Sequence, residues 1–184
     1  MQKRTNASDI FALCAEKFHI TERAAAGFFT VLKKQGVHSD DLVVRLQEMA
    51  IHHKEILERF EGFKCYFPEV EELREKAGQA IAVGEFYHAE QHLQQARKNA
   101  QAVISDLKEH NTQPVAVLKE WQISETEICT NLAMLYLLQY YYSDAVQFFQ
   151  AAAAALPEER KEEQAFCLCQ AGSILWDIDR YSEA

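Results

Sequence analysis

Glycine and proline are scarce in this sequence, and no apolar run reaches the length of a membrane span. The chain has 6 glycines and 3 prolines among 184 residues, too few for a fold built from many short strands and tight turns. A membrane span needs about 20 consecutive apolar residues. The most apolar segment, NLAMLYLLQYYYSDAVQFFQAAAAALP at 131–157, is interrupted by Gln139 and Asp144. It therefore predicts two amphipathic helices that meet near Tyr140–Ser143, and no membrane association.

Cysteines are few, and basic residues are rare towards the end of the chain. The 5 cysteines are an odd, scattered set, which indicates reduced thiols in a cytoplasmic protein. The N-terminal MQKRTNASDIFALCAEK lacks the apolar core of a secretory signal. Residues 125–184 carry 3 basic and 10 acidic side chains. Because this acidic third would repel phosphate backbones, we expect no nucleic-acid partner there.

Motifs of catalysis and metal binding are missing as well. The sequence has no G-x-x-x-x-G-K-[ST] phosphate loop and no G-x-S-x-G nucleophile elbow. His88 and His92 share a helix face, but Ala89 stands where a metalloprotease motif has glutamate. Cys167-x-Cys169 lacks the C-x-x-C spacing of zinc and redox sites, so we expect two buried packing thiols. The chain is predicted not to be an enzyme and to bind no metal and no cofactor.

The sequence does contain a repeated pattern of small and aromatic residues. Its central copy consists of Leu132-Ala133-x-x-Tyr136, Tyr142, Ala145-x-x-x-Phe149, Ala152 and Pro157. Less complete copies comprise Gly172-x-x-Leu175, Tyr181 and Ala184 downstream, and Ala77-x-x-Ala80, Phe86, Ala89-x-x-x-Leu93 and Ala96 upstream. The small residues let antiparallel helices approach closely, and the aromatic rings fill the space towards the next pair. Pro157 is predicted to begin the following helix.

This pattern resembles the tetratricopeptide (TPR) repeat, which reads W-x-x-L-G-x-x-Y, A-x-x-x-F and P over 34 residues. Cys129 stands at the tryptophan position and Ala133 at the glycine position. The resemblance covers about residues 68–184. It implies an all-α, TPR-like solenoid of antiparallel helix pairs, with 63–184 as a partial array of about 2.5 repeats.

Residues 1–62 are helical by pattern and resemble a short module that precedes TPR arrays in some bacterial multi-repeat proteins. Asn6 or Ser8 can cap a first helix, and Thr21 can cap a second that runs through Leu32 and ends by Gly36. Ser39-Asp40-Asp41 is expected to open a third helix. That helix carries a heptad stripe made of Leu42, Leu46, Met49, His53, Ile56 and Phe60.

The upstream and central copies are separated by more than one repeat period. Ala77 and Ala133 lie 56 residues apart, which is about 22 more than the period. No glycine or proline interrupts the extra segment before HNTQP at 110–114. We therefore predict a long antiparallel hairpin, with helices of roughly 20–25 residues on either side of His110–Pro114.

The resemblance also implies a binding groove, because the first helix of each TPR unit lines a concave surface that holds a peptide or a helix. The matching positions are Arg74, Glu75, Gly78, Glu127, Thr130, Asn131, Met134, Leu138, Phe166, Gln170, Ser173 and Trp176. For Met134, Leu138 and Trp176, ordinary core packing is an equal alternative. Chaperone-binding TPR domains hold a carboxylate in a basic clamp. Arg74 and Asn131 match two clamp positions, whereas Gly78, Phe166 and Gln170 depart from it.

These features predict one function, given first, and leave two alternatives open. The first is a protein-interaction scaffold or adaptor whose partner is another protein or peptide. The second is a regulatory or sensor segment that controls an effector or NTPase domain elsewhere in a longer chain. The third is a DNA-binding regulator, because ALCAEKFHITERAAAGFF resembles a helix-turn-helix with 22–32 as the reading helix. That helix offers Ala24 to Phe29, a packing surface, where base readout needs Arg, Asn, Gln or Ser.

The last apolar segment, AFCLCQAGSILW at 165–176, lacks a following partner in the pattern. A solenoid buries each unit's apolar face against the next and ends in a polar cap. We therefore expect the chain to be a fragment truncated at Ala184, with an exposed C-terminal edge through which it can self-associate. The apolar residues of this edge are Phe166, Leu168, Ala171, Ile174, Leu175 and Trp176.

Overall fold

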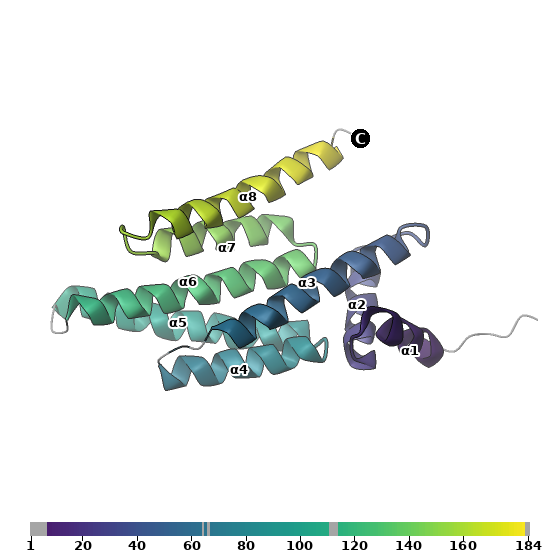
Figure 1. Cartoon of the computed structure of the whole chain (residues 1–184), viewed down its shortest axis with the longest axis horizontal. Helices are drawn as coiled ribbons and strands as arrows, with labels where there is room; N and C mark the ends of the chain where they lie inside the picture. Colours follow the sequence, from purple (N-terminus) through teal and green to yellow (C-terminus); the bar gives the residue numbers. More distant parts are fainter. Residues whose placement is uncertain (1–6, 64, 66, 111–113, 183–184) are drawn as a thin grey trace, which may run out of the picture.

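A computed structural model describes residues 7–63, 65, 67–110 and 114–182. These residues form eight α-helices and no strand, which confirms the expected all-α class. Figure 1 labels the helices in chain order. They are α1 (Ala7–Phe18), α2 (Glu22–Lys34), α3 (Leu42–Gly62), α4 (Pro68–Ala82), α5 (Phe86–His110), α6 (Val115–Leu138), α7 (Tyr142–Ala155) and α8 (Lys161–Ser182).

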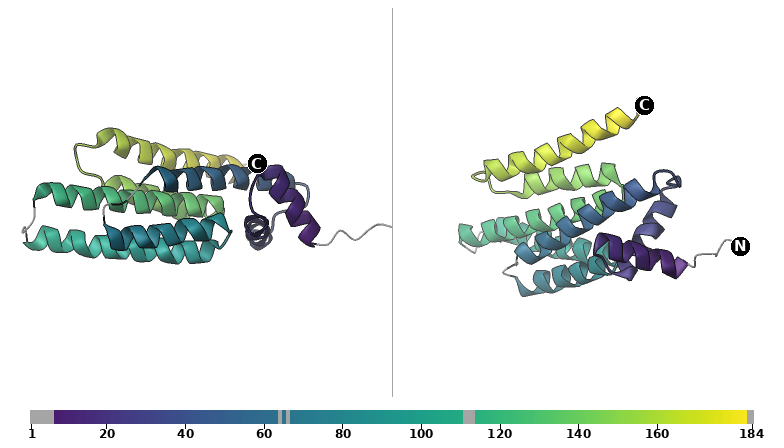
Figure 2. Two further views of the ribbon diagram at one scale, coloured as in Figure 1. Left: turned by 60° about the horizontal axis from the view of Figure 1, so that its bottom comes forward. Right: turned by 45° about the vertical axis from the view of Figure 1, so that its right-hand side comes forward.

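Helices α4 to α8 lie side by side in chain order, each antiparallel to the one before it (Figure 1). Helix α3 crosses this layer and packs on both α4 and α6, while α1 and α2 lie at one end (Figures 1 and 2). One hydrophobic core extends from α2 and α3 through α4 and α5 to α6. Smaller clusters join α6, α7 and α8. The N-terminal helices thus share their core with the helix layer.

The predicted long hairpin is confirmed. Helix α5 has 25 residues and α6 has 24, and the two run antiparallel (Figure 2). Their neighbours α4 and α7 have only 15 and 14 residues, so the hairpin projects beyond them. Ala100 and Ile104 are buried in the projecting part of α5. Residues 111–113, within the expected tip, lie outside the described residues.

Helix α2 docks against the turn between α4 and α5. Thr21 caps α2 as predicted, because its hydroxyl accepts a hydrogen bond from Ala24 N at 3.0 Å and donates one to Ala82 O at 3.2 Å. The closest approach joins two glycines, where a Cβ on Gly27 would lie 2.5 Å from Gly84 O. Gly84 also has a φ of +77°, a conformation that favours glycine. Only glycine therefore fits this junction without movement of the backbone.

The heptad stripe of α3 faces the core, as predicted. Five of its six members are buried, and Leu42 is partly buried. His53 Nε2 lies 2.9 Å from Ile81 O, so the neutral ring can donate a hydrogen bond to this carbonyl. Burial lowers the pKa of His53 from its ordinary value, because the interior disfavours the charged imidazolium. The stripe therefore joins α3 to the end of α4 by apolar packing and one buried polar contact.

One expected helix start is wrong, and one of the two alternative caps of the first helix is excluded. Pro157 does not begin a helix: a turn closed by Arg160 N and Pro157 O at 2.9 Å follows it, and α8 begins at Lys161. Ser8 is not the cap of α1, because α1 already begins at Ala7, while Asn6 lies outside the described residues.

Candidate partner-binding groove

An open groove runs between α3 and α8, floored by α6 and α7. It consists of two adjoining cavities of about 440 Å³ and 580 Å³. His52 from α3, Leu137 from α6 and Gln170 from α8 line both cavities, which makes the groove continuous. Each of the two volumes is within the range of pockets that hold ligands.

The side chains of the α3 wall are polar, and their positions on the helix follow from those of the heptad stripe. Its residues recur every three or four positions, each one residue before a stripe position, and are Arg45, Glu48, His52, Glu55 and Arg59. One residue corresponds to a rotation of about 100° around a helix. The stripe enters the core, and this adjacent face is therefore turned towards the groove.

The opposite wall and the floor have a different chemistry. The α8 wall consists of Phe166, Gln170, Ser173 and Asp177, again at helical spacing, with Ile174 and Ile178 at its foot. Met134 and Leu137 from α6 and Phe149 from α7 give an apolar floor. Tyr140 and Tyr142 line the end of the groove nearest Arg45. The groove thus combines an apolar floor with two polar rims, which is the usual composition of a protein-binding surface.

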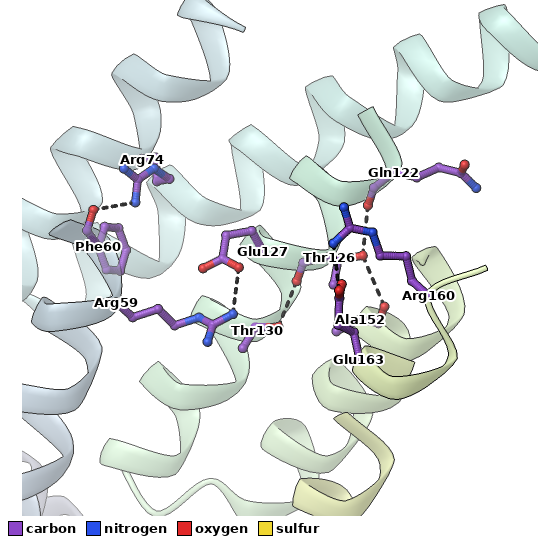
Figure 3. A network of polar contacts seen from close by, with 10 residues as sticks. All are labelled: Arg59, Phe60, Arg74, Gln122, Thr126, Glu127, Thr130, Ala152, Arg160 and Glu163. Atoms are coloured by element: carbon purple, nitrogen blue, oxygen red, sulfur yellow. Dashed lines mark hydrogen bonds and ion pairs between the residues drawn. The ribbon is translucent and has the colours of Figure 1, made fainter. Parts of the chain in front are cut away.

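The ionisable side chains of the α3 wall contact one another or a residue of α6. Arg45 NH1 lies 2.9 Å from Glu48 Oε2, and His52 Nδ1 lies 3.2 Å from Glu55 Oε2. Arg59 NH2 reaches across to Glu127 Oε2 on α6 at 2.7 Å (Figure 3). This wall therefore offers balanced hydrogen-bonding groups and no strong field of one sign, which suits recognition by shape and apolar contact.

Tyr140 fixes one end of the groove. Its hydroxyl lies 3.1 Å from Arg45 O and 3.3 Å from Glu48 Oε2. Burial, helped by the nearby Glu48 carboxylate, raises the pKa of this hydroxyl. The phenol therefore stays protonated and ties α3 to the end of α6 at neutral pH.

The structure brings some of the residues predicted for a groove together. Thr130 and Met134 lie on its floor, and Gln170, Ser173 and Phe166 lie on its α8 wall. Thr130 is otherwise buried and donates its hydroxyl hydrogen to Thr126 O at 2.9 Å. Glu127 is 9% exposed and is paired with Arg59. Its contribution to the groove is therefore to hold Arg59 in place.

Other predicted residues lie elsewhere, and Arg74 differs most from the expectation. Its side chain is buried, with Nε and NH2 donating to the two oxygens of Glu71 at 2.8 Å and 3.0 Å. Its NH1 donates to Phe60 O at 3.0 Å (Figure 3), and the Phe60 and Phe63 rings stack over the guanidinium. Arg74 therefore joins α4 to the end of α3 and is not free to hold a carboxylate.

Five other predicted residues also lie outside the groove. The Phe60 ring lies over Gly78, where a Cβ would come within 3.1 Å of it. Asn131 and Leu138 on α6 are fully buried, whereas Glu75 is exposed on α4 outside the two cavities. Trp176 is 67% exposed but does not line the groove. The face of α4 and α6 predicted to bind a partner is thus covered in part by α3 of the same chain.

Sequence reasoning missed the α3 wall entirely. The spacing of Arg45, Glu48, His52, Glu55 and Arg59 is visible beside the stripe. It indicates an exposed helix face, but it does not show that this face is opposite α8. That arrangement depends on α3 crossing α4 and α6, a tertiary contact for which the sequence pattern has no signal.

The histidine, cysteine and helix-turn-helix candidates have structural settings of their own. His88 Nδ1 lies 3.3 Å from Glu85 Oε2, and within the described ranges no three His, Cys, Asp or Glu side chains group as a metal site. Cys167 is buried as expected, but Cys169 is exposed, which corrects the prediction of two buried thiols. On α2, Ala24, Ala25 and Phe28 are buried. The face proposed to read DNA therefore packs inside the protein.

The fold and the groove define an all-helical protein with an open cleft between a crossing helix and the last helix of a layer. Comparison with family models, curated proteins and solved structures gave no match. None of the helices in the described part of the chain is long and apolar enough to cross a membrane.

Proposed function

We propose that this chain is a non-catalytic, TPR-like interaction scaffold that holds a peptide or helix of another protein in the groove between α3 and α8. The repeat pattern supports the TPR-like part. Ala133 and Ala145, the small residues of the central copy, are both fully buried where α6 packs on α7. The antiparallel pairs α4–α5 and α6–α7, followed by α8, have the chain order that a TPR array requires.

The observation that carries the binding function is the composition of the groove. Its floor is apolar and open, and the polar side chains of the α3 wall contact one another or Glu127. Apolar anchors surrounded by a polar rim supply most of the binding energy in protein interfaces. A partner segment with apolar side chains on one side and hydrogen-bonding groups at its edges would complement this surface.

Helix α3 gives the groove its particular shape. In this arrangement the N-terminal module contributes one wall, and the repeat helices contribute the floor and the other wall. Because Arg74 is covered by the end of α3 and Asn131 is buried, the binding surface is shifted towards Met134, Leu137 and Gln170. A partner would therefore contact both segments of the chain at once.

A capture experiment with paired variants tests this proposal. The immobilised wild-type chain is compared with a Phe166→Lys, Ser173→Lys double variant, which changes only exposed positions on the groove wall. The matched control is Gln91→Lys, Gln95→Lys on the exposed face of α5. We expect a partner whose recovery falls about tenfold, or ~1.4 kcal/mol, with the groove variant and is unchanged with the control. Equal recovery on all three chains would refute the groove as the binding site.

A further inference from the structure

The end of the groove nearest Arg45 is lined by two tyrosines and one aspartate. Tyr140 lies in the turn after α6 and Tyr142 begins α7, and their ring centres are 6.0 Å apart with the ring planes at 72°. Asp177 is exposed on α8 and lines the same cavity of about 580 Å³. These three residues (Tyr140, Tyr142 and Asp177) form the tyrosine end of the groove.

The tyrosine rings of this turn already attract cations from the same chain. Arg45 Cζ lies 5.4 Å from the ring centre of Tyr140, and Lys34 Nζ lies 5.3 Å from that of Tyr141. The face of an aromatic ring attracts a positive charge within about 6 Å. Arg45 is paired with Glu48, so its charge is compensated, and Lys34 approaches a ring that does not line the groove. The ring chemistry at this end therefore suits a positively charged side chain.

The charge of the surrounding groups has the matching sign. Arg45 and Glu48 neutralise each other at 2.9 Å, whereas Asp177 forms no ion pair with any residue that the structure describes. Asp144 on α7 is likewise unpaired within these residues and lines a smaller cavity of about 280 Å³, which shares both tyrosines with the groove. The groove side of the tyrosine pair is therefore negative by one charge.

The other end of the groove is apolar and has no such excess of charge. Phe149 and Phe166 line its cavity of about 440 Å³, and Arg59 in the same wall is paired with Glu127 at 2.7 Å. Phe166 and Asp177 are 11 positions apart on α8, which corresponds to roughly 16 Å along a helix. One bound segment can thus place an apolar side chain at the first end and a charged side chain at the second.

We propose that the segment held in the groove carries a lysine or an arginine whose cation lies at the tyrosine end beside Asp177. An apolar side chain of the same segment fills the cavity beside Phe166. The proposal rests on the binding function of the groove and names the charge of its partner. The cation takes the Asp177 carboxylate as its ion-pair partner and the Tyr142 ring as a wall. An acidic side chain at this place would meet a like charge.

A selection from random peptides tests the proposal. A display library of 15-residue peptides is selected on the immobilised wild-type chain. Clones are kept if they lose binding to the variant Phe166→Gln, Ser173→Gln, which alters the groove wall without adding charge. We expect Lys and Arg to be at least about threefold more frequent in these clones than in the unselected library, because the site favours a cation. Groove-dependent clones without this enrichment would overturn the present proposal alone. If no clone depends on the groove, its binding function fails and this proposal fails with it.

A double-mutant cycle then locates the cation. In the tightest groove-dependent peptide, each Lys or Arg is replaced by Gln in turn. Affinity is measured by fluorescence anisotropy for wild type, for Asp177→Asn and for the control Glu162→Gln, an exposed carboxylate of α8 outside the groove. One replacement should weaken binding about tenfold to wild type and control but less than about twofold to Asp177→Asn. Circular dichroism checks that each variant keeps its helices. Equal losses on the three chains would overturn the proposal.

Discussion

The two ends of the helix layer differ in how completely they are covered. At the N-terminal end, α2 meets the α4–α5 turn so closely that the backbones of Gly27 and Gly84 touch. At the C-terminal end, α8 buries one side against α7 and leaves Leu168 and Leu175 about half exposed. The helix layer is therefore closely packed at its N-terminal end, whereas its last helix exposes apolar side chains at the C-terminal end. The groove lies between them and takes one wall from each.

The comparison shows where polar groups are used for stability and where for recognition. At the closed end, buried Arg74 and His53 bond to backbone carbonyls and tie α3 to α4. At the open end, Gln170 and Ser173 remain at the surface of the groove. Substitutions at the closed end should therefore affect folding, and those at the open end should affect binding.

Arg74 offers the largest expected effect. Arg74→Met would remove the two guanidinium bonds to Glu71 and the bond to Phe60 O. Removal of one partner from a buried ion pair typically costs about 3–5 kcal/mol. We expect a loss of that size in chemical denaturation. The exposed neighbouring variant Glu75→Gln should stay within about 0.5 kcal/mol of the wild type. An Arg74→Met chain as stable as the wild type would restore Arg74 as a candidate binding residue.

The same glycine substitution should have opposite effects at the two ends. Gly27→Ala would place a methyl group 2.5 Å from Gly84 O, a backbone atom that cannot turn aside. The overpacking should cost about 2 kcal/mol. Gly172→Ala meets open space, and alanine should stabilise the helix by roughly 0.5–1 kcal/mol. Thermal unfolding of both variants measures the difference, and a shift of the same sign in both would contradict the comparison.

The sequence predicted the fold class and most helices because their signals are local. The stripe from Leu46 to Phe60, the cap at Thr21 and the unbroken segment before His110 each act within a helix. The groove was predicted only in part. Met134, Gln170 and Ser173 lie in it, but Arg74 and Asn131 are buried, and α3 was not expected to form a wall. These failures share one cause, since the position of α3 is set by contacts between residues far apart in the sequence.

His53 should make the stability of the closed end depend on pH. Burial lowers its pKa in the folded chain, so the unfolded chain binds the proton more readily below pH ~6.5. Stability is therefore full above that pH and declines as pH falls towards the lowered folded value. The slope contributed by one proton is at most ~1.4 kcal/mol per pH unit. Unfolding of wild type and His53→Gln between pH 5 and 8 measures it. Parallel curves would show that the ring titrates freely in the folded chain.

The smallest effect on folding is expected at Leu175. Tyr136, which lies 39 residues earlier in the corresponding position of the repeat pattern on α6, provides the contrast. Tyr136 donates to Glu90 Oε1 at 2.7 Å, and burial together with this carboxylate raises its pKa to about 12. Tyr136→Gln would lose this bond and the stacking on Phe148, at a cost of about 2 kcal/mol. Leu175→Gln should cost less than about 0.5 kcal/mol, because its side chain is 45% exposed.

Chemical denaturation of Tyr136→Gln and Leu175→Gln beside the wild type measures both losses. Equal losses in the two variants would show that the half-exposed leucine is packed as closely as the stacked tyrosine, and would contradict the difference in coverage along the layer.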